Sequence, residues 1–120
     1  MPSDSKGYDP QRSQVSDDTL TEWLETDLEE DLQQVPGVGT KAAEALRTAG
    51  VQTPYALIGQ FLLLKESDMD STAHCNAFWN WLNRVGVRSH RAGIVHCVAE
   101  KCNVFLPGIY DRSAVDVEMS

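Results

Sequence analysis

The fold of this chain is decided by the stretch VPGVGTKAAEALRTAG at residues 35–50, in which two glycines stand directly before a helical pattern. Gly37 and Gly39 let the backbone turn sharply and approach another molecule closely, because glycine has no Cβ. Thr40 is a suitable N-cap, and the alanines and leucine behind it recur at the spacing of one buried helix face. We therefore expect a tight turn that opens a helix over residues 40–48.

The start of this helix is a candidate site for phosphate. Its first N–H groups have no partner inside the helix, and the positive end of the helix dipole lies beside them. Two helices joined by a Pro-Gly-Val-Gly turn resemble a helix-hairpin-helix, a module that grips the backbone of nucleic acids without reading bases. The alternative is a plain helix corner in which glycine serves geometry alone, so phosphate binding here is a hypothesis. If it holds, glutamate in place of Gly37 should abolish binding while the fold stays intact.

A second basic turn, VGVRSHR at residues 85–91, has one glycine and therefore a poorer set of free amides. Side chains in and directly before this turn suit phosphate through charge and forked hydrogen bonds, and they are Arg84, Arg88, His90 and Arg91. Two such turns on one small domain would contact neighbouring phosphates of a duplex. A solvated basic turn without a ligand is the alternative, and it remains open.

The net charge of −8 is unevenly distributed along the chain. Residues 1–33 hold ten acids and two bases, residues 34–106 hold five acids and seven bases, and residues 107–120 hold three acids and one base. The central block is therefore slightly basic, at +2, which is weak beside the basic patch of a dedicated DNA-binding protein. Backbone amides would have to contribute more than side-chain charge, or the protein would have to act as an oligomer.

A chain of 120 residues is long enough for one domain with a single modest core. Its composition predicts four segments: a disordered tail at 1–16, an acidic amphipathic helix at 17–33, a helical domain at 34–106 and a flexible tail at 107–120. The acids of the helix at 17–33 form a solvated face or, alternatively, compete for the basic surface when DNA is absent.

The rest of the pattern is helical, with no strand pattern. Thr53 and Pro54 open a helix that runs to about residue 65, and further helices are expected over about 75–84 and 89–103. The first of these is apolar nearly all round, so it is either the central core helix or is partly buried against a partner. The predicted fold is an all-α bundle of about five helices with one hairpin and a second, imperfect hairpin.

Several classes of protein and site are not indicated. No apolar run approaches the length that spans a bilayer, and the N-terminus carries no secretion pattern. The three cysteines are odd in number and lie among apolar residues, which favours reduced, partly buried thiols. The histidines and cysteines match no zinc pattern, and no nucleophilic or acid–base constellation suggests catalysis. We therefore expect no metal, no cofactor and no enzymatic activity. The histidines and cysteines concerned are His74, Cys75, His96, Cys97 and Cys102.

The chain resembles the barrier-to-autointegration factor family over roughly residues 34–106. The resemblance rests on GVG at 37–39, Gly50, IGQFLLLK at 58–65, FWNWL at 78–82, and the closing Cys97, Glu100, Cys102 and Phe105-Leu106. It implies a SAM-like helical domain that forms a symmetric homodimer and binds double-stranded DNA without sequence preference. One DNA site per subunit would let the dimer bridge two duplexes in chromatin, and a groove across the dimer would bind LEM-domain proteins of the inner nuclear membrane. The implied location is the nucleus, with the cytoplasm also open.

The same resemblance implies two sets of site residues. DNA would be held by the two turns through Gly37, Val38, Gly39, Thr40, Lys41, Arg88, Ser89, His90 and Arg91. The dimer or partner contact would include Leu57, Ile58, Gly59, Phe61 and Trp81. In the tail, Lys6 is placed like a DNA-contacting lysine of the family, and phosphate added to Ser3 or Ser5 would repel DNA by charge.

The chain also departs from the family pattern. The basic cluster expected on the hairpin helix is replaced by Ala42, Ala43, Glu44 and Ala45, which lowers the expected DNA affinity. The acidic helix and the C-terminal tail have no counterpart in the resemblance. Two alternatives therefore stand beside the DNA-bridging homodimer: a dimerising adaptor that pairs with a DNA-binding relative or a LEM-type envelope protein and binds DNA weakly, and a hairpin subunit of a repair or replication nuclease.

Overall fold

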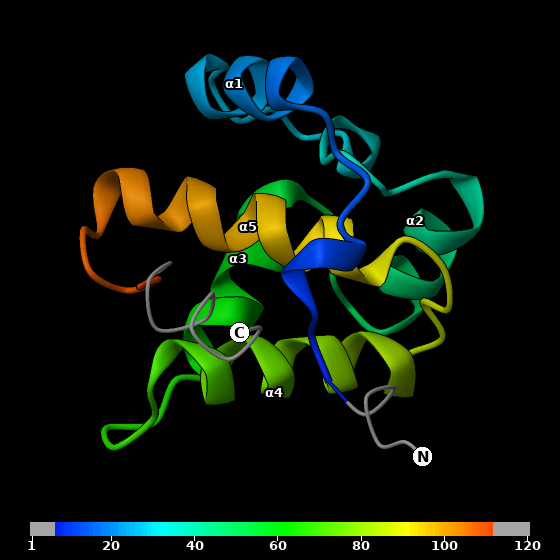
Figure 1. The fold of residues 1–120 in the computed structure, drawn as a ribbon. Helices are drawn as coiled ribbons and strands as arrows, with labels where there is room; N and C mark the ends of the chain where they lie inside the picture. The colour runs from blue at the N-terminus through cyan, green and yellow to red at the C-terminus, as the bar shows by residue number, and fades with distance from the viewer. Residues whose placement is uncertain (1–6, 112–120) are drawn as a thin grey trace.

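The computed structural model describes residues 7–111, so the expectations for Ser3, Ser5, Lys6 and residues 112–120 lie outside the described residues. The described part is entirely helical (Figure 1). Its α-helices are α1 (Asp17–Glu25), α2 (Thr40–Thr48), α3 (Pro54–Leu63), α4 (Ser71–Arg84) and α5 (Arg91–Phe105), with short 3-10 turns η2 (Pro10–Arg12) and η3 (Leu32–Gln34). The expectation of an all-α fold of about five helices is confirmed.

Helix α5 is the central element of the core. Ten of its residues are buried, and α1, α3 and α4 all pack against it (Figure 1). The apolar pattern after Pro54 left α3 as a candidate for this position, but α3 leaves Tyr55 and Leu63 exposed. The central position goes to α5 because it is both long and lined by small and β-branched side chains that let neighbouring helices approach on several sides.

Most helix boundaries follow from local capping. Thr53 caps α3 through the amide of Ala56, with proline in the first turn as expected. Helix α4 starts at Ser71, four residues earlier than about 75, because the carboxylate of Asp70 accepts from the amide of Ala73. The apolar pattern that predicts this helix begins only at about residue 75 and does not reveal the Asp70 cap in the polar stretch before it.

Helix α1 is shorter than expected and is held by α5. It ends at Glu25 instead of continuing to residue 33, and Leu32 instead lies buried in η3. The Nζ of Lys101 donates to the carbonyls of Trp23 at 2.7 Å and Leu24 at 3.3 Å, and also to that of Thr26. A buried ammonium group at the carboxyl end of α1 satisfies its last carbonyls and complements the helix dipole, so the helix stops there.

The N-terminal segment is folded where it is described. We call residues 7–16 the N-terminal strap: it runs from α4 across α5 to the start of α1 (Figure 1). Tyr8 is buried, and its amide donates to Oδ1 of Asn76 at 2.7 Å. Its hydroxyl lies 3.3 Å from the hydroxyl of Tyr110, which is also buried. The expected disordered and flexible tails are thus wrong for residues 7–16 and 107–111, because two tyrosines pair the ends of the domain beside the core.

None of the described helices combines the length and the apolar composition needed to cross a membrane.

Candidate nucleic-acid interface

The two predicted turns line one groove. It has a volume of about 1160 Å³ and is formed by the hairpin before α2, the turn before α5 and the N-terminal strap. Of the residues expected to bind DNA, the groove is lined by Gly37, Val38, Gly39, Arg88, His90 and Arg91. Thr40, Lys41 and Ser89 are exposed beside these residues in the chain but do not line it.

The two turns contact each other through Gly37 and His90. Gly37 has φ +96°, and a Cβ there would lie 2.9 Å from Cγ1 of Ile94 and 3.4 Å from the carbonyl oxygen of His90. His90 itself has φ 61°, a left-handed conformation that side chains rarely adopt. Backbone conformation and packing therefore both favour glycine at 37, so glutamate there should destabilise the fold and is not a clean test of binding.

Helices α2 and α5 begin without a side-chain cap. The N-cap of α2 is Gly39 and that of α5 is His90, and neither residue's side chain caps its helix with a hydrogen bond. Thr40, expected as the cap, is instead the first residue of α2, and its hydroxyl accepts from Nε2 of Gln33 at 3.4 Å. By contrast, α1, α3 and α4 all have a side-chain cap. Both uncapped helices start at the groove, which the capped start of α1 also borders through Ser16 and Thr19.

Not all backbone amides of the first turn are free to donate to a ligand. The amide of Val38 donates to the carbonyl of Val35 at 3.0 Å, and its side chain is buried. Val38 therefore anchors the turn in the core and offers no N–H group to a phosphate, contrary to expectation. Within residues 7–111, the amides of Gly37, Gly39 and Thr40 donate to no acceptor, so they are the free N–H donors of this turn.

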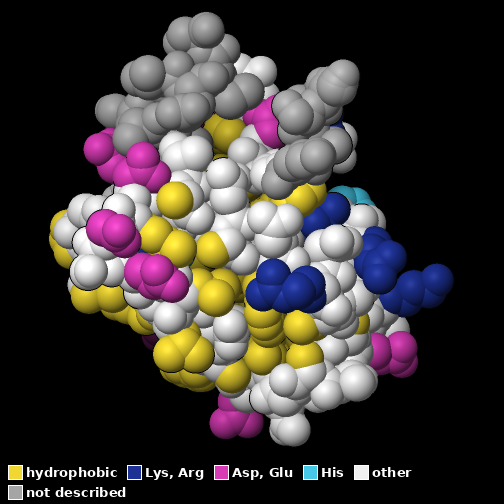
Figure 2. All heavy atoms as spheres, turned by 90° about the horizontal axis from the view of Figure 1, so that it is seen from below, with side chains coloured by type: hydrophobic (Ala, Val, Ile, Leu, Met, Phe, Trp, Pro, Cys, Tyr) yellow, Lys and Arg dark blue, Asp and Glu magenta, His cyan; other side chains and the backbone are white. Residues whose placement is uncertain are grey.

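Arg91 is held in place by an aromatic ring. Its Cζ lies 3.6 Å from the centre of the Trp79 ring, and its Nη1 donates to the carbonyl of Trp79 at 3.3 Å. Burial lowers the pKa of Arg91, and the nearby Arg88 lowers it further, but an arginine stays charged at neutral pH. Figure 2 shows Lys and Arg side chains gathered toward one edge of the face seen from below, with most Asp and Glu of that face away from them.

Trp79 also lines the groove, and sequence reasoning missed its contact with Arg91. The signal that pairs Trp79 with Arg91 is a contact between two helices, which no local pattern contains.

The expected dimer contact needs correction. Leu57 and Phe61 are completely buried in the core of the chain itself, and Ile58 is 6% exposed, so none of the three presents a surface to a partner. Gly59 is exposed and Trp81 is half-buried. A helix sequence that is apolar nearly all round does not reveal which face of the helix points inward. The pattern therefore does not separate the buried residues of α3 from those on its surface.

The surface that α3 presents is a different stripe. Tyr55 is 56% exposed and Leu63 is 77% exposed, and with Gly59 they recur every four residues along one side of the helix.

The cysteines are free, buried thiols, and burial raises the pKa of Cys75, Cys97 and Cys102 to about 12. Thiols of this kind are poor nucleophiles and poor metal ligands. In residues 7–111, no group of histidine, cysteine and acidic side chains is arranged to hold a metal ion.

Comparison with protein-family models matches residues 13–105 to the family described as barrier to autointegration factor. No curated protein and no solved structure matches the chain. The matched range includes α1, so the acidic helix lies within the family domain, and the expectation that it has no counterpart there is wrong. The first part of the strap, residues 7–12, and the segment 106–111 lie outside the match.

Proposed function

Because this chain belongs to the barrier-to-autointegration factor family, we propose that it is a non-enzymatic protein that binds double-stranded DNA without sequence preference. The groove supports this proposal through its chemistry: main-chain amides and arginines contact phosphates, and phosphate contacts carry no sequence information. The groove lining includes Gly37, Gly39, Arg88 and Arg91.

The observation that carries the proposal is the pair of uncapped helix N-termini. Helices α2 and α5 start at one groove with no side chain on their first amides, whereas α1, α3 and α4 are capped by Ser16, Thr53 and Asp70. Each free N-terminus offers N–H donors and the positive end of a dipole, which together favour a phosphate. Two of them at one groove would hold neighbouring phosphates of a DNA backbone.

We further propose that the protein acts as a homodimer that bridges two duplexes, one per groove, in nuclear chromatin and at the nuclear envelope. The exposed stripe of Tyr55, Gly59 and Leu63 on α3 supports self-association, since large apolar side chains seldom remain exposed in a row without a partner. LEM-domain proteins of the inner nuclear membrane are the proposed envelope partners.

The test uses Gly39→Glu, with Gly39→Ala as its control. Gly39 has φ −94°, and a Cβ there meets no atom within 4 Å, so both variants should fold. The glutamate places an anion beside the free amides and should abolish duplex binding in fluorescence anisotropy at low salt, whereas the alanine should bind like the wild-type protein. Equal binding by both variants would overturn the proposed site.

The same anisotropy titrations with linear, branched and nicked DNA distinguish a sequence-independent duplex-binding protein from a nuclease subunit. Equal affinity for linear duplexes of different sequence is expected, and affinity should fall steeply with salt because bound phosphates release counterions. A marked preference for branched or nicked DNA would instead favour the subunit of a repair or replication nuclease.

A second candidate is the dimerising adaptor, which binds DNA weakly and pairs with a DNA-binding relative or a LEM-type protein. It is favoured by the net charge of −8 and by Glu44, where the family resemblance implies a basic cluster on the hairpin helix. Sedimentation of the purified protein with a short duplex distinguishes the two candidates. Two duplexes per dimer favour bridging, and robust mixed pairing without a DNA complex favours the adaptor.

A further inference from the structure

The loop between α1 and η3 carries only negative charge. Residues 27–31, which we call the acidic loop, include four exposed acids, which are Asp27, Glu29, Glu30 and Asp31. No lysine or arginine occurs between Arg12 and Lys41. Neighbours in the chain therefore do not neutralise this charge, and its effect depends on where the fold places the loop.

Hydrogen bonds place the acidic loop beside the start of α3. The hydroxyl of Tyr55 donates to the carbonyl of Leu28 at 2.9 Å. The side chain of Gln34 closes the loop, because its Nε2 donates to the carbonyl of Asp27 at 2.8 Å and its Oε1 accepts from the amide of Glu29 at 2.8 Å. Tyr55 is also the first residue of the exposed stripe of α3, so the acidic loop lies at one end of that stripe.

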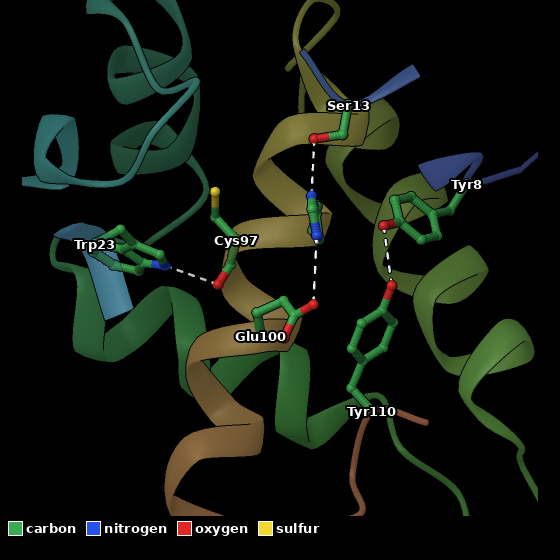
Figure 3. A network of polar contacts seen from close by, with 7 residues as sticks. Tyr8, Ser13, Trp23, Cys97, Glu100 and Tyr110 are labelled. Carbon is green, nitrogen blue, oxygen red and sulfur yellow. Dashed lines mark hydrogen bonds and ion pairs between the residues drawn. The ribbon is translucent and has the colours of Figure 1, made fainter. Parts of the chain in front are cut away.

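The elements on either side of the acidic loop are fixed to the core. The indole Nε1 of Trp23 donates to the carbonyl of Cys97 at 2.8 Å and ties α1 to α5 (Figure 3). Lys101 holds the last carbonyls of α1 as described above. After the loop the chain enters η3, where Leu32 is completely buried. The loop is therefore held beside the stripe from both of its ends.

Two carboxylates of the acidic loop are free to interact with a partner. Among residues 7–111, the carboxylates of Glu29 and Glu30 accept no hydrogen bond and form no ion pair. Asp31 differs, because its Oδ1 accepts from the amide of Gln33 at 2.9 Å. The charge that a partner would meet at this end of the stripe is thus carried mainly by the two glutamates.

The opposite end of the stripe is also acidic. The stripe ends at Leu63, and the segment that follows it, residues 64–70, contains one base, Lys65. The same segment contains three exposed acids, which are Glu66, Asp68 and Asp70. Negative charge therefore exceeds positive charge beyond both ends of the stripe.

This arrangement opposes pairing of the stripe with itself. A two-fold dimer places the same surface patch of each copy against the other. If the two α3 helices ran parallel, the acidic loops would face each other. If they ran antiparallel, each acidic loop would face residues 64–70 of the other copy. Like charges would meet in both cases, and because they are exposed, salt would screen their repulsion.

We propose that the stripe of Tyr55, Gly59 and Leu63 pairs most tightly with a chain of opposite charge, one whose own apolar helix face is flanked by lysines and arginines. Charge complementarity around an apolar contact favours such a partner and disfavours a second copy of this chain. The homodimer is then the weaker pair, and its stability rises with salt. This inference rests on the proposed role of the stripe as a dimer surface.

The experiment uses a charge-reversed form of this chain as the model partner. Glu29→Lys/Glu30→Lys keeps the apolar stripe but places lysines beside it, and the bond from Glu29 to Gln34 is retained because the main-chain amide makes it. Wild-type protein with a fluorescent label at its N-terminus is titrated with unlabelled wild-type protein or with this variant. Fluorescence-detected sedimentation without DNA measures both affinities over a range of salt concentrations.

At low salt, the variant should bind the labelled wild-type protein at least about fivefold more tightly than the wild-type protein binds itself. The difference should shrink as the salt concentration rises. This result is expected for either direction of the two helices, because in both the lysines face acids of the wild-type chain.

The matched control is Glu22→Lys/Glu44→Lys. It changes the net charge by the same amount, at exposed positions on α1 and α2. It should bind the labelled wild-type protein no more tightly than the unlabelled wild-type protein does. An equal gain from the control would assign the effect to net charge and would overturn the inference.

Leu63→Ser separates this inference from the proposed dimer. Leu63 is 77% exposed, so the variant should fold, and circular dichroism checks that it does. It should abolish pairing with the wild-type chain and with the charge-reversed chain. If the wild-type protein pairs with neither chain at any salt concentration, or if Leu63→Ser pairs normally, the proposed dimer surface fails. If Leu63→Ser abolishes pairing but the wild-type protein binds itself as tightly as it binds the charge-reversed chain, the dimer stands and this inference is overturned.

Discussion

The guanidinium group of Arg91 lies over the indole of Trp79, with its Cζ 3.6 Å from the ring centre, and its Nη1 donates to the carbonyl of the same residue. The pair joins the first turn of α5 to the middle of α4, so the arginine reaches the groove from a fixed base. A pre-positioned arginine loses less side-chain entropy when it binds a phosphate.

Trp79→Ala should weaken duplex binding about threefold to tenfold, because the cation–π contact that positions Arg91 contributes on the order of 1 kcal/mol. Anisotropy measurements on Trp79→Ala, Arg91→Ala and the double variant form a thermodynamic cycle. The double variant should bind as weakly as Arg91→Ala alone, since Trp79 acts through the arginine. Fully additive losses would show that Trp79 contacts DNA independently.

Gly37→Ala should lower the free energy of unfolding by about 2–3 kcal/mol, because the left-handed backbone and the contact with Ile94 both oppose a Cβ. Gly50→Ala is the matched control: its φ is +93°, but a Cβ there meets nothing within 4 Å. Urea unfolding should therefore show a smaller loss for Gly50→Ala. Equal losses would mean that the contact between the two turns adds nothing to backbone strain.

Lys101→Met should destabilise the protein by about 2–3 kcal/mol, because it leaves the last carbonyls of α1 without their charged donor. Urea unfolding measures the loss, and Lys41→Met serves as the control because Lys41 is exposed. The control should change stability by less than about 0.5 kcal/mol. A harmless Lys101→Met would show that α1 ends at Glu25 for another reason.

Stability should fall in mild acid because of His74. This side chain is completely buried: its Nε2 donates to the carbonyl of Phe61 at 2.6 Å, and its Nδ1 has no partner among residues 7–111. Burial lowers the pKa of His74 from its ordinary value of 6.5, so the unfolded chain takes up a proton first as the pH falls. Its contribution to stability is therefore present above about pH 6.5 and is lost as the pH falls toward the lower folded-state pKa.

The measurement for His74 is the urea midpoint at several pH values between neutral and mildly acidic. His74→Leu cannot titrate at this position, so its midpoint should depend less on pH than that of the wild-type protein, even if it is lower throughout. Parallel pH profiles for the two proteins would assign the acid sensitivity to other groups.

Asp17→Asn together with Asp18→Asn should raise DNA affinity several-fold at low salt. The two acids lie between Ser16 and Thr19, which line the groove, and both are exposed. Removing them takes negative charge away from the path of the phosphates. Because acids stabilise a helix N-terminus, each substitution should also lower the stability of the protein by up to about 1 kcal/mol. Glu25→Gln, at the other end of α1, is the control, and an equal gain per charge removed would point to net charge alone.

Local patterns in the sequence predicted the helices well and the burial of α3 poorly. The boundaries of α2 and the cap of α3 follow from glycines, a threonine and a proline that act on the residues next to them. Leu57 and Phe61 were placed at a partner surface, yet both are completely buried in this chain. Hydrophobicity marks such residues as buried but does not say whether the chain's own core or a partner covers them.

In the candidate site, too, some features follow from neighbouring residues and others only from tertiary packing. The sequence alone determined an all-α fold and two glycine-containing turns that open helices, because each depends on residues within a few positions of one another. Only the tertiary structure decided that both turns line one groove, that Arg91 rests on Trp79, and that residues 11, 12 and 14–16 line the same groove. Those relationships join segments far apart in the chain, and they arise from packing against α5, which no short stretch of sequence contains.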